Sequence, residues 1–445
     1  MKARKYPIGI QTFSRIIREG YLYVDKTDLV WQLAHYTTFV FLSRPRRFGK
    51  SLLTSTLESY FCGERVLFEG LKIMELEQEW VQYPVIRLDL SGTKHAGVQG
   101  VSDELGRLIK DYEKVYGSDA GETTPGMRFA GIVGRAYEQT GRQVAVIIDE
   151  YDAPLLDVLH EDAALKEIRE VMQEFYQRLK MLEPKIKFCF ITGVTKFSQL
   201  SIFSTINNLT NVTMDPVFST ICGITEEELT TVMADDIKML ADSYGETPEQ
   251  MYQRLKLWYD GYCVDGLDIY NPRSVVESIL RGKIRNYWNA TETYKALQDY
   301  IKLNFDGLRD KVSAMIAGDR IHVNPAKFQN DMTSFHSADD VLTLLIHLGY
   351  LTYDFQTSTA WIPNSEVQQE FINSIEDGGW EEIMNAIRAS DELIQATLDG
   401  DTKTVERLIA RSHEENTSIL KYNDENSLAC VISLAYYTAR KNYIM

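Results

Sequence analysis

The sequence has few cysteines, and their arrangement suggests neither a disulfide framework nor a zinc knuckle. The five cysteines are odd in number, widely scattered, and include no Cys-x-x-Cys pair. Disulfide-rich domains carry even numbers of cysteines at close spacings, and zinc knuckles carry them in close pairs. We therefore interpret all five as small hydrophobic side chains.

Long apolar runs are also missing. No stretch approaches the roughly 18 consecutive apolar residues that a membrane-spanning helix needs. The N-terminal residues Met1–Lys5 are basic, but the apolar run of a signal peptide does not follow them. The sequence predicts a cytoplasmic protein with no membrane partner.

Internal repeats and low-complexity tracts are absent as well. Hydrophobic residues make up 44% of the chain and charged residues 25%, which is ordinary globular usage and excludes a largely disordered or collagen-like chain. At roughly 150 residues per domain, a chain of 445 residues has about three domains, each able to bury a core.

Acidic residues are missing from the window that contains the most basic loop of the chain. The chain has 47 Lys and Arg against 64 Asp and Glu, a formal net charge of −17, which disfavours an extended polyanion as partner. From Leu29 to Leu57 no acidic residue occurs, and Arg44, Arg46, Arg47 and Lys50 lie inside that window. An acidic chain with one cationic loop predicts a localised anion site.

The first half of the chain alternates short apolar runs with amphipathic stretches, as in an α/β domain with a parallel sheet. The continuous apolar character of the runs is typical of strands covered on both faces. The predicted strands are Phe39–Leu42, Val85–Leu90, Val144–Ile148 and Phe188–Ile191. The predicted helices between them are Ser102–Tyr116, Met127–Gln139 and Ala164–Met181.

Helical patterns dominate from Thr225 onward. Thr225 and Glu228 have the spacing of a capping box, and Asn271-Pro272 predicts the start of a helix. Further on, a helix over Ala338–Leu348, then Gly349 and two short strands match a winged helix-turn-helix. Any small α+β packing module fits that last pattern equally well. The residues from Ser374 to Met445 are predicted to be helical.

The most informative motif is the segment Ser43–Ser51, which follows a predicted strand and opens a predicted helix. Free N–H groups at a helix N-terminus bind phosphate, Lys50 would reach the β- and γ-phosphates, and Ser51 would bind Mg²⁺. The match to G-x-x-x-x-G-K-[ST] is incomplete, because Arg44 occupies the first glycine position and Pro45 has no N–H. A bare Gly-Lys-Ser also occurs by chance.

Two carboxylates at the end of a second strand strengthen the hypothesis. Asp149 would orient Mg²⁺ and Glu150 would act as base for the attacking water. Thr192, at the end of a third strand, is a candidate contact for the γ-phosphate or the water. The alternative is a buried strand that simply ends in solvated acids.

These motifs together predict the fold and a site. The fold is an α/β P-loop NTPase with a parallel sheet and helices on both faces, followed by a helical segment, a winged-helix-like α+β unit and a helical C-terminal segment. The predicted catalytic residues are Glu150, Lys50 and Thr192, and the predicted metal ligands are Ser51 and Asp149. The predicted nucleotide contacts are Arg44, Arg46, Arg47, Phe48, Gly49, Lys50, Ser51 and Leu52.

Several motifs distributed over nearly the whole chain extend this pattern: Tyr6–Ile10, Tyr23–Thr27, Ser43–Ser51, Asp149–Asp152, Tyr259–Tyr262, Tyr270–Pro272, Asn286–Trp288 and Pro363–Val367. With them the chain resembles the AAA-ATPase-like family common in Bacteroides and other anaerobes. The resemblance implies a P-loop ATPase related to the STAND-type ATPases, with ATP as the nucleotide and Mg²⁺ as the metal. It also implies that the helical segment after Thr225 is a lid.

The same resemblance implies a C-terminal nuclease of the PD-(D/E)XK type. Tyr422–Ser427 resembles its start, with Glu425 as its first acid, but no strand with the catalytic carboxylates follows before Met445. We expect a truncated nuclease and no nuclease activity in this chain. The expected domains are an ATPase over 1–222, a lid over 223–290, a winged-helix-like unit over 291–375 and a helical segment over 376–445.

The favoured function is a nucleotide-controlled switch that binds ATP and hydrolyses it slowly, with an unidentified protein partner. One alternative is a scaffold that binds nucleotide without hydrolysing it. Another is a DNA-associated regulator acting through the winged helix, but Ala338–Leu348 has no Lys or Arg for phosphate contacts. Nucleic acid is therefore only weakly supported as a partner.

Overall fold

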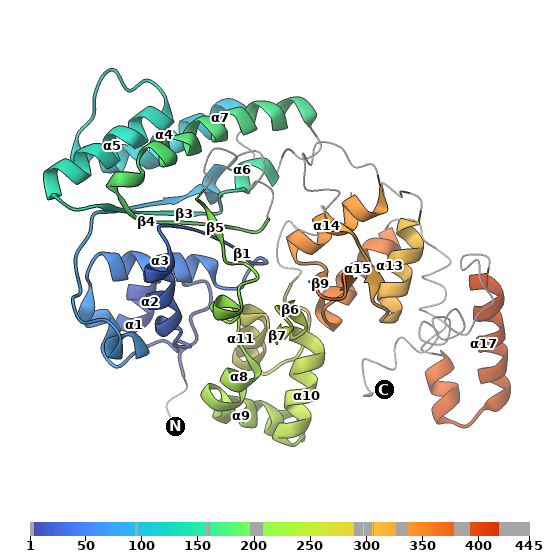
Figure 1. Cartoon of the computed structure of the whole chain (residues 1–445). Helices are drawn as coiled ribbons and strands as arrows, with labels where there is room; N and C mark the ends of the chain where they lie inside the picture. Colours follow the sequence, from blue (N-terminus) through green and yellow to red (C-terminus); the bar gives the residue numbers. More distant parts are fainter. Residues whose placement is uncertain are drawn as a thin grey trace.

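The structure of the chain is a computed structural model (Figure 1). It describes residues 4–93, 97–156, 158, 161–195, 208–288, 297, 305, 307–325, 337–377 and 392–417. The nuclease-like segment Tyr422–Ser427 lies outside the described residues, as does the joint expected near 290.

A five-stranded parallel sheet forms the centre of the N-terminal half. Its strands are β1 (Phe39–Ser43), β2 (Val85–Asp89), β3 (Val144–Asp149), β4 (Ile186–Gly193) and β5 (Thr210–Asn211). They lie in the order β2-β3-β4-β1-β5. In the register, Leu42 pairs with Thr192 and Ile148 with Ile191, so β1, β3 and β4 end at the same edge. The four predicted strands are confirmed, and β4 separates the loop strand from the acidic strand.

Helices cover both faces of this sheet, as predicted. Figure 1 shows α4, α5 and α7 on one face and α1, α2 and α3 on the other. All side chains of β1 and β3 are buried, because a central parallel strand contacts helices on both sides. The bounds are α1 (Phe13–Arg18), α2 (Thr27–Tyr36), α3 (Lys50–Phe61), α4 (Gly97–Tyr116), α5 (Pro125–Thr140), α6 (Ala153–Leu156) and α7 (Asp162–Met181).

A helical unit with its own hydrophobic cluster follows the sheet. It contains α8 (Glu226–Val232), α9 (Ala234–Tyr244), α10 (Pro248–Tyr259), α11 (Pro272–Arg281) and the hairpin β6 (Tyr262–Val264) and β7 (Leu267–Ile269). Thr225 and Glu228 form the predicted capping box. Asn271 accepts from two backbone N–H groups at the start of α11, with Pro272 as the first helical residue. Local sequence chemistry therefore predicted these two helix starts correctly.

The last described part combines helices with a small antiparallel sheet in the order β8-β10-β9. Its elements are α13 (Leu308–Ala317), β8 (Ile321–His322), α14 (Ala338–Leu348), β9 (Thr352–Asp354), β10 (Thr359–Trp361), α15 (Ser365–Asp377) and α17 (Thr402–Thr417). Helix α14 and the hairpin after Gly349 occur where the sequence predicts them. Contacts of β9 with β6 and of α15 with α10 join this part to the helical unit.

Two further expectations concern cysteines and membranes. Cys189 and Cys222 are buried, whereas Cys62 and Cys263 are only partly buried, and all four are free thiols. Among the helices that the structure describes, none is long and apolar enough to cross a membrane.

Candidate nucleotide site

A cavity of about 640 Å³ lies at the edge of the sheet where β1 and β3 end. Cationic, acidic and hydroxyl side chains all face it, which is the mixture that a phosphate–metal site requires. The lining residues are Pro7, Ile8, Gly9, Ile10, Gln11, Arg46, Arg47, Gly49, Lys50, Ser51, Leu52, Ser91, Glu150, Pro272, Arg273 and Val276. They come from the N-terminal segment, the loop after β1, the end of β3 and the start of α11.

The loop between β1 and α3 has the backbone shape of an anion cradle. Gly49 has φ +93° and immediately precedes α3, a conformation that glycine adopts without strain. Arg47 has φ +71°, which is uncommon for a residue with a side chain. The first N–H groups of α3 have no partner within the helix, so they are available to an anion at this end.

Lys50 is almost fully buried and is held inside the loop. Its ammonium group donates to the carbonyl oxygens of Arg44 at 3.1 Å and Pro45 at 3.2 Å. The Glu150 carboxylate lies 3.9 Å from the same nitrogen. A phosphate entering the cavity would therefore replace these oxygens as the partner of Lys50.

The carboxylates at the end of β3 have distinct surroundings. Asp149 is fully buried and accepts hydrogen bonds from the Thr54 hydroxyl, the Glu150 N–H and the Ser51 hydroxyl. Burial, with the nearby Glu150 charge, raises the pKa of Asp149. Glu150 has φ +52°, a strained conformation that turns its side chain toward the cavity. One acid is thus paired with the loop serine, while the other faces the cavity.

The adjacent oxygens of Ser51 and Asp149 fit a magnesium ion. Hard oxygen donors suit Mg²⁺, which commonly takes one or two protein ligands and completes its shell with phosphate oxygens and water. Over the described ranges, no cluster of three or more His, Cys, Asp or Glu side chains could hold a metal alone.

The structure corrects the prediction for the Arg44 side chain. Its guanidinium is buried under the sheet edge and donates to the carbonyl oxygens of Thr213 at 2.7 Å and Phe218 at 3.0 Å. It also donates to the carbonyls of Ser43 and Ser219. Burial lowers the pKa of Arg44. Because all these partners are backbone oxygens inside the protein, the side chain anchors the loop and does not face the cavity.

Thr192 also differs from its expected role. Its hydroxyl is buried and donates to the Leu42 carbonyl at 2.7 Å, joining β4 to β1. It is not among the residues that line the cavity. Nearby, buried Asp152 accepts from the N–H groups of Val194 and Thr195 and from the Thr195 hydroxyl, so it fixes the end of β4. Both side chains support the sheet edge.

The other predicted loop residues are divided between two cavities. Arg46 and Arg47 line the large one, whereas Phe48 is buried and lines a smaller neighbour. Gly49 and Leu52 line both. The predicted phosphate loop therefore borders two adjoining spaces.

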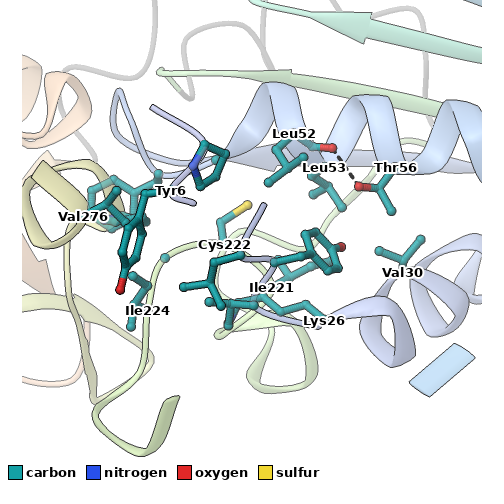
Figure 2. Close-up of a pocket in the computed structure, with 18 of the residues that line it drawn as sticks. Tyr6, Lys26, Val30, Leu52, Leu53, Thr56, Ile221, Cys222, Ile224 and Val276 are labelled. Atoms are coloured by element: carbon teal, nitrogen blue, oxygen red, sulfur yellow. Dashed lines mark hydrogen bonds between the residues drawn. The ribbon is translucent and has the colours of Figure 1, made fainter. Parts of the chain in front are cut away.

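The smaller cavity, of about 130 Å³, is mainly apolar. Figure 2 shows Leu52, Leu53 and Thr56 of α3 along one side and Ile221 and Cys222 across from them. The other labelled lining residues are Tyr6, Lys26, Val30, Ile224 and Val276. An apolar space beside a cationic, hydroxyl-lined one has the division of properties found in a nucleotide, with a flat base and charged phosphates.

Sequence reasoning missed Arg273 and the N-terminal segment Pro7–Gln11 as cavity residues. Arg273 lies in the first turn of α11, and its charge lowers the pKa of Arg47 after the larger effect of burial. The Asn271-Pro272 start signal located this helix end, but nothing local indicated which surface the helix end would face.

Comparison with known proteins agrees with this geometry. Residues 7–203 match the family model AAA-ATPase_like, described as a predicted AAA-ATPase. This match supports the AAA-ATPase-like resemblance for that part of the chain and supports its assignment as a P-loop nucleotide-binding segment. The large cavity, the loop and the acidic strand all include residues of the matched range.

A curated relative has no known function. The chain is 35% identical over 303 residues to an uncharacterized protein in the vnfD 5′ region of Azotobacter chroococcum mcd 1. The alignment covers 68% of this chain and 57% of the relative, so the chain spans just over half of that protein's length.

Two solved structures show weak likeness. The Aeropyrum pernix ORC2 protein, in ADPNP–ADP complexes, has a TM-score of 0.41 and 12% identity, over 82% of this chain and 98% of that one. Cdc6p from Pyrobaculum aerophilum has a TM-score of 0.26 and 10% identity, over 85% and 96%. The fold assignment rests on the strand order and the loop geometry of the chain itself.

Proposed function

We propose that this chain binds Mg-ATP across the two adjoining cavities, hydrolyses it slowly, and acts as a nucleotide-controlled switch. The observation that carries the proposal is the convergence of Lys50, Ser51, Asp149 and Glu150 at one edge of the sheet, beside a cavity of about 640 Å³. The AAA-ATPase-like match of residues 7–203 supports ATP as the nucleotide.

In this proposal the phosphates occupy the large cavity and the base occupies the apolar one. The N-terminus of α3, Lys50 and the cavity-lining Arg46 and Arg273 would neutralise the phosphates. Ser51 and Asp149 would hold Mg²⁺, which when bound neutralises charge on the phosphate oxygens. Leu52 lines both cavities and so marks their junction.

Glu150 is the proposed base. Its carboxylate faces the cavity, and phosphate binding would draw Lys50 away from it, leaving it free to accept a hydrogen bond from water. Thr192 keeps a supporting role, because its hydroxyl already donates to Leu42.

Two variants test the proposal. Lys50→Ala should abolish Mg-ATP binding, and Glu150→Gln should retain binding but lose phosphate release. Binding is measured as a thermal shift, which tight binding produces by mass action. The surface variant Glu138→Gln, whose carboxylate pairs with Lys185 just before the start of β4 and so at the opposite end of the sheet from the cavity, should behave as wild type. Absence of any Mg-ATP shift in the wild-type protein would refute the proposal.

The alternatives have less support. A scaffold that never hydrolyses nucleotide leaves the cavity-facing Glu150 without a role. DNA binding through α14 is disfavoured because most of this helix is buried and its charged residues include no Lys or Arg. The expected domain boundaries and the absence of nuclease activity remain proposals.

A further inference from the structure

Behind the loop Ser43–Ser51 lie three other motifs from distant parts of the sequence: Tyr259–Tyr262, Asn286–Trp288 and Pro363–Val367. Tyr262 packs edge-on against Phe48 of the loop, with ring centroids 4.8 Å apart, and stacks at 6.2 Å on Trp288. The Asn364 side chain donates to the Asp260 carbonyl at 2.8 Å. The site's loop is thus backed by the helical unit and by the start of α15.

Glu366 is the polar centre of this meeting point. It lies in the first turn of α15 and has no exposed surface. Its carboxylate accepts from the Ser274 hydroxyl at 2.8 and 3.0 Å and from the Tyr287 N–H at 2.5 Å. One side chain therefore ties α15 to α11 and to the segment 286–288.

Each of the two residues that donate to Glu366, Tyr287 and Ser274, is directly linked to an arginine that lines the cavity. Arg47 donates to the Tyr287 carbonyl at 2.7 Å, and its guanidinium lies 5.8 Å from the Trp288 ring. Arg273 directly precedes Ser274. Arg47 and Arg273 both line the phosphate cavity. Glu366 is thus connected to each arginine through one intervening residue, and it is not itself among the residues that line the cavity.

A carboxylate is a costly choice for a purely structural link at this position. Burying a charge carries a desolvation penalty that a neutral side chain of similar shape avoids. Burial raises the pKa of Glu366 to about 7, and the hydrogen bonds from the Tyr287 N–H and the Ser274 hydroxyl oppose that rise. The same hydrogen bonds that join α15 to the two segments therefore favour the charged form of the carboxyl group.

We propose that Glu366 is a positioning residue of the nucleotide site: from α15 it holds segment 286–288 and the start of α11, and so sets the positions of Arg47 and Arg273 at the phosphate cavity. This inference rests on the proposed function for its effect on ATP, but not for its effect on the loop. The last described part of the chain would then complete the nucleotide site.

The test compares Glu366→Ala and Glu366→Gln with Gln368→Ala. Gln368 is a suitable control because it is also a buried residue of α15, but its side chain donates to the Ile316 carbonyl of α13 rather than holding α11 or segment 286–288. Amide hydrogen exchange over residues 44–50 and 271–276 is measured without nucleotide, and the Kd for Mg-ATP is measured separately. The Glu366→Gln variant serves where Glu366→Ala does not fold.

We expect Glu366→Ala to speed exchange in both segments at least tenfold and to weaken Mg-ATP at least tenfold, with Glu366→Gln intermediate because it retains one acceptor oxygen. Gln368→Ala should change both by less than threefold. Unchanged exchange over 44–50 and 271–276, or equal effects of Glu366→Ala and Gln368→Ala, would overturn the proposal. If the wild-type protein binds no Mg-ATP, the proposed function fails, while the exchange data still decide whether Glu366 positions the loop.

Discussion

The Lys50 ammonium and the Glu150 carboxylate lie 3.9 Å apart, and both residues line the large cavity. Lys50 also donates to two carbonyl oxygens of its own loop. The two groups with the clearest expected roles thus neutralise each other when no phosphate is present. Nucleotide binding must exchange this internal pair for a pair between Lys50 and phosphate.

The first prediction follows from that exchange. Glu150→Gln should bind Mg-ATP several-fold more tightly than wild type, because it removes both a competitor for Lys50 and a negative charge close to the phosphates. Isothermal titration at low and moderate salt measures this. The tightening should be smaller at higher salt, and equal or weaker binding than wild type would contradict it.

Arg44 should matter for stability rather than for nucleotide contact. Arg44→Ala removes buried charged donors from the Thr213 and Phe218 carbonyl oxygens, so we expect a loss on the order of 3 kcal/mol in the free energy of unfolding. Urea unfolding measures this loss. Arg46→Ala is the comparison: it should change stability little but weaken Mg-ATP. A larger stability loss for Arg46→Ala than for Arg44→Ala would contradict the assignment.

Gly349 touches the phosphate loop from α14. It has φ +84°, and a Cβ added there would lie 2.6 Å from the Pro45 Cβ. Gly349→Ala should therefore destabilise the protein by roughly 2–4 kcal/mol and also weaken Mg-ATP by displacing the loop.

Gly282→Ala is the matched control for Gly349→Ala. Gly282 ends α11 with φ +63°, but a Cβ there would meet nothing within 4 Å. We expect only the conformational cost of about 1–2 kcal/mol, with no effect on nucleotide affinity. Equal effects of the two substitutions on stability and on Kd would show that the contact with Pro45 is unimportant.

The buried carboxyl group of Asp260 should make the stability of the protein depend on pH. Burial raises its pKa to about 7, and its Oδ1 has no hydrogen-bond partner among the residues that the structure describes. Between pH 4 and 7 the folded state therefore holds a proton that the unfolded state has released. Because the folded state binds more protons in that window, the free energy of unfolding falls as pH rises through it and levels off above about pH 7.

Asp260→Asn cannot titrate, so it should lose this component. Relative to wild type, the variant should gain at least about 1 kcal/mol of stability between pH 5 and pH 8. Urea unfolding of both proteins at the two pH values measures the difference, and other titrating groups cancel in the comparison. An unchanged difference would mean that Asp260 is ionised throughout.

Sequence reasoning succeeded where the signal is local. The apolar strands at Phe39 and Val144, the capping box at Thr225 and the start of α11 at Asn271 each depend on neighbouring residues, and each is present. It was less reliable for the roles of individual loop side chains. Arg44 and Thr192 both have residue types suited to phosphate contact, but their backbone partners come from distant segments.

The sequence alone determined which functional groups occur along the chain and in what order. A cationic glycine-lysine-serine loop follows one buried strand, and a pair of acids follows another. Strand burial and helix capping make those features local, so they can be recognised without the fold. Only the tertiary structure decided which side chains line the large cavity. Arg44 is directed inward because the loop after β5 presents its carbonyl oxygens there, whereas Arg273 reaches the cavity because α11 begins beside it. Both outcomes depend on contacts between segments more than a hundred residues apart, which no local pattern encodes.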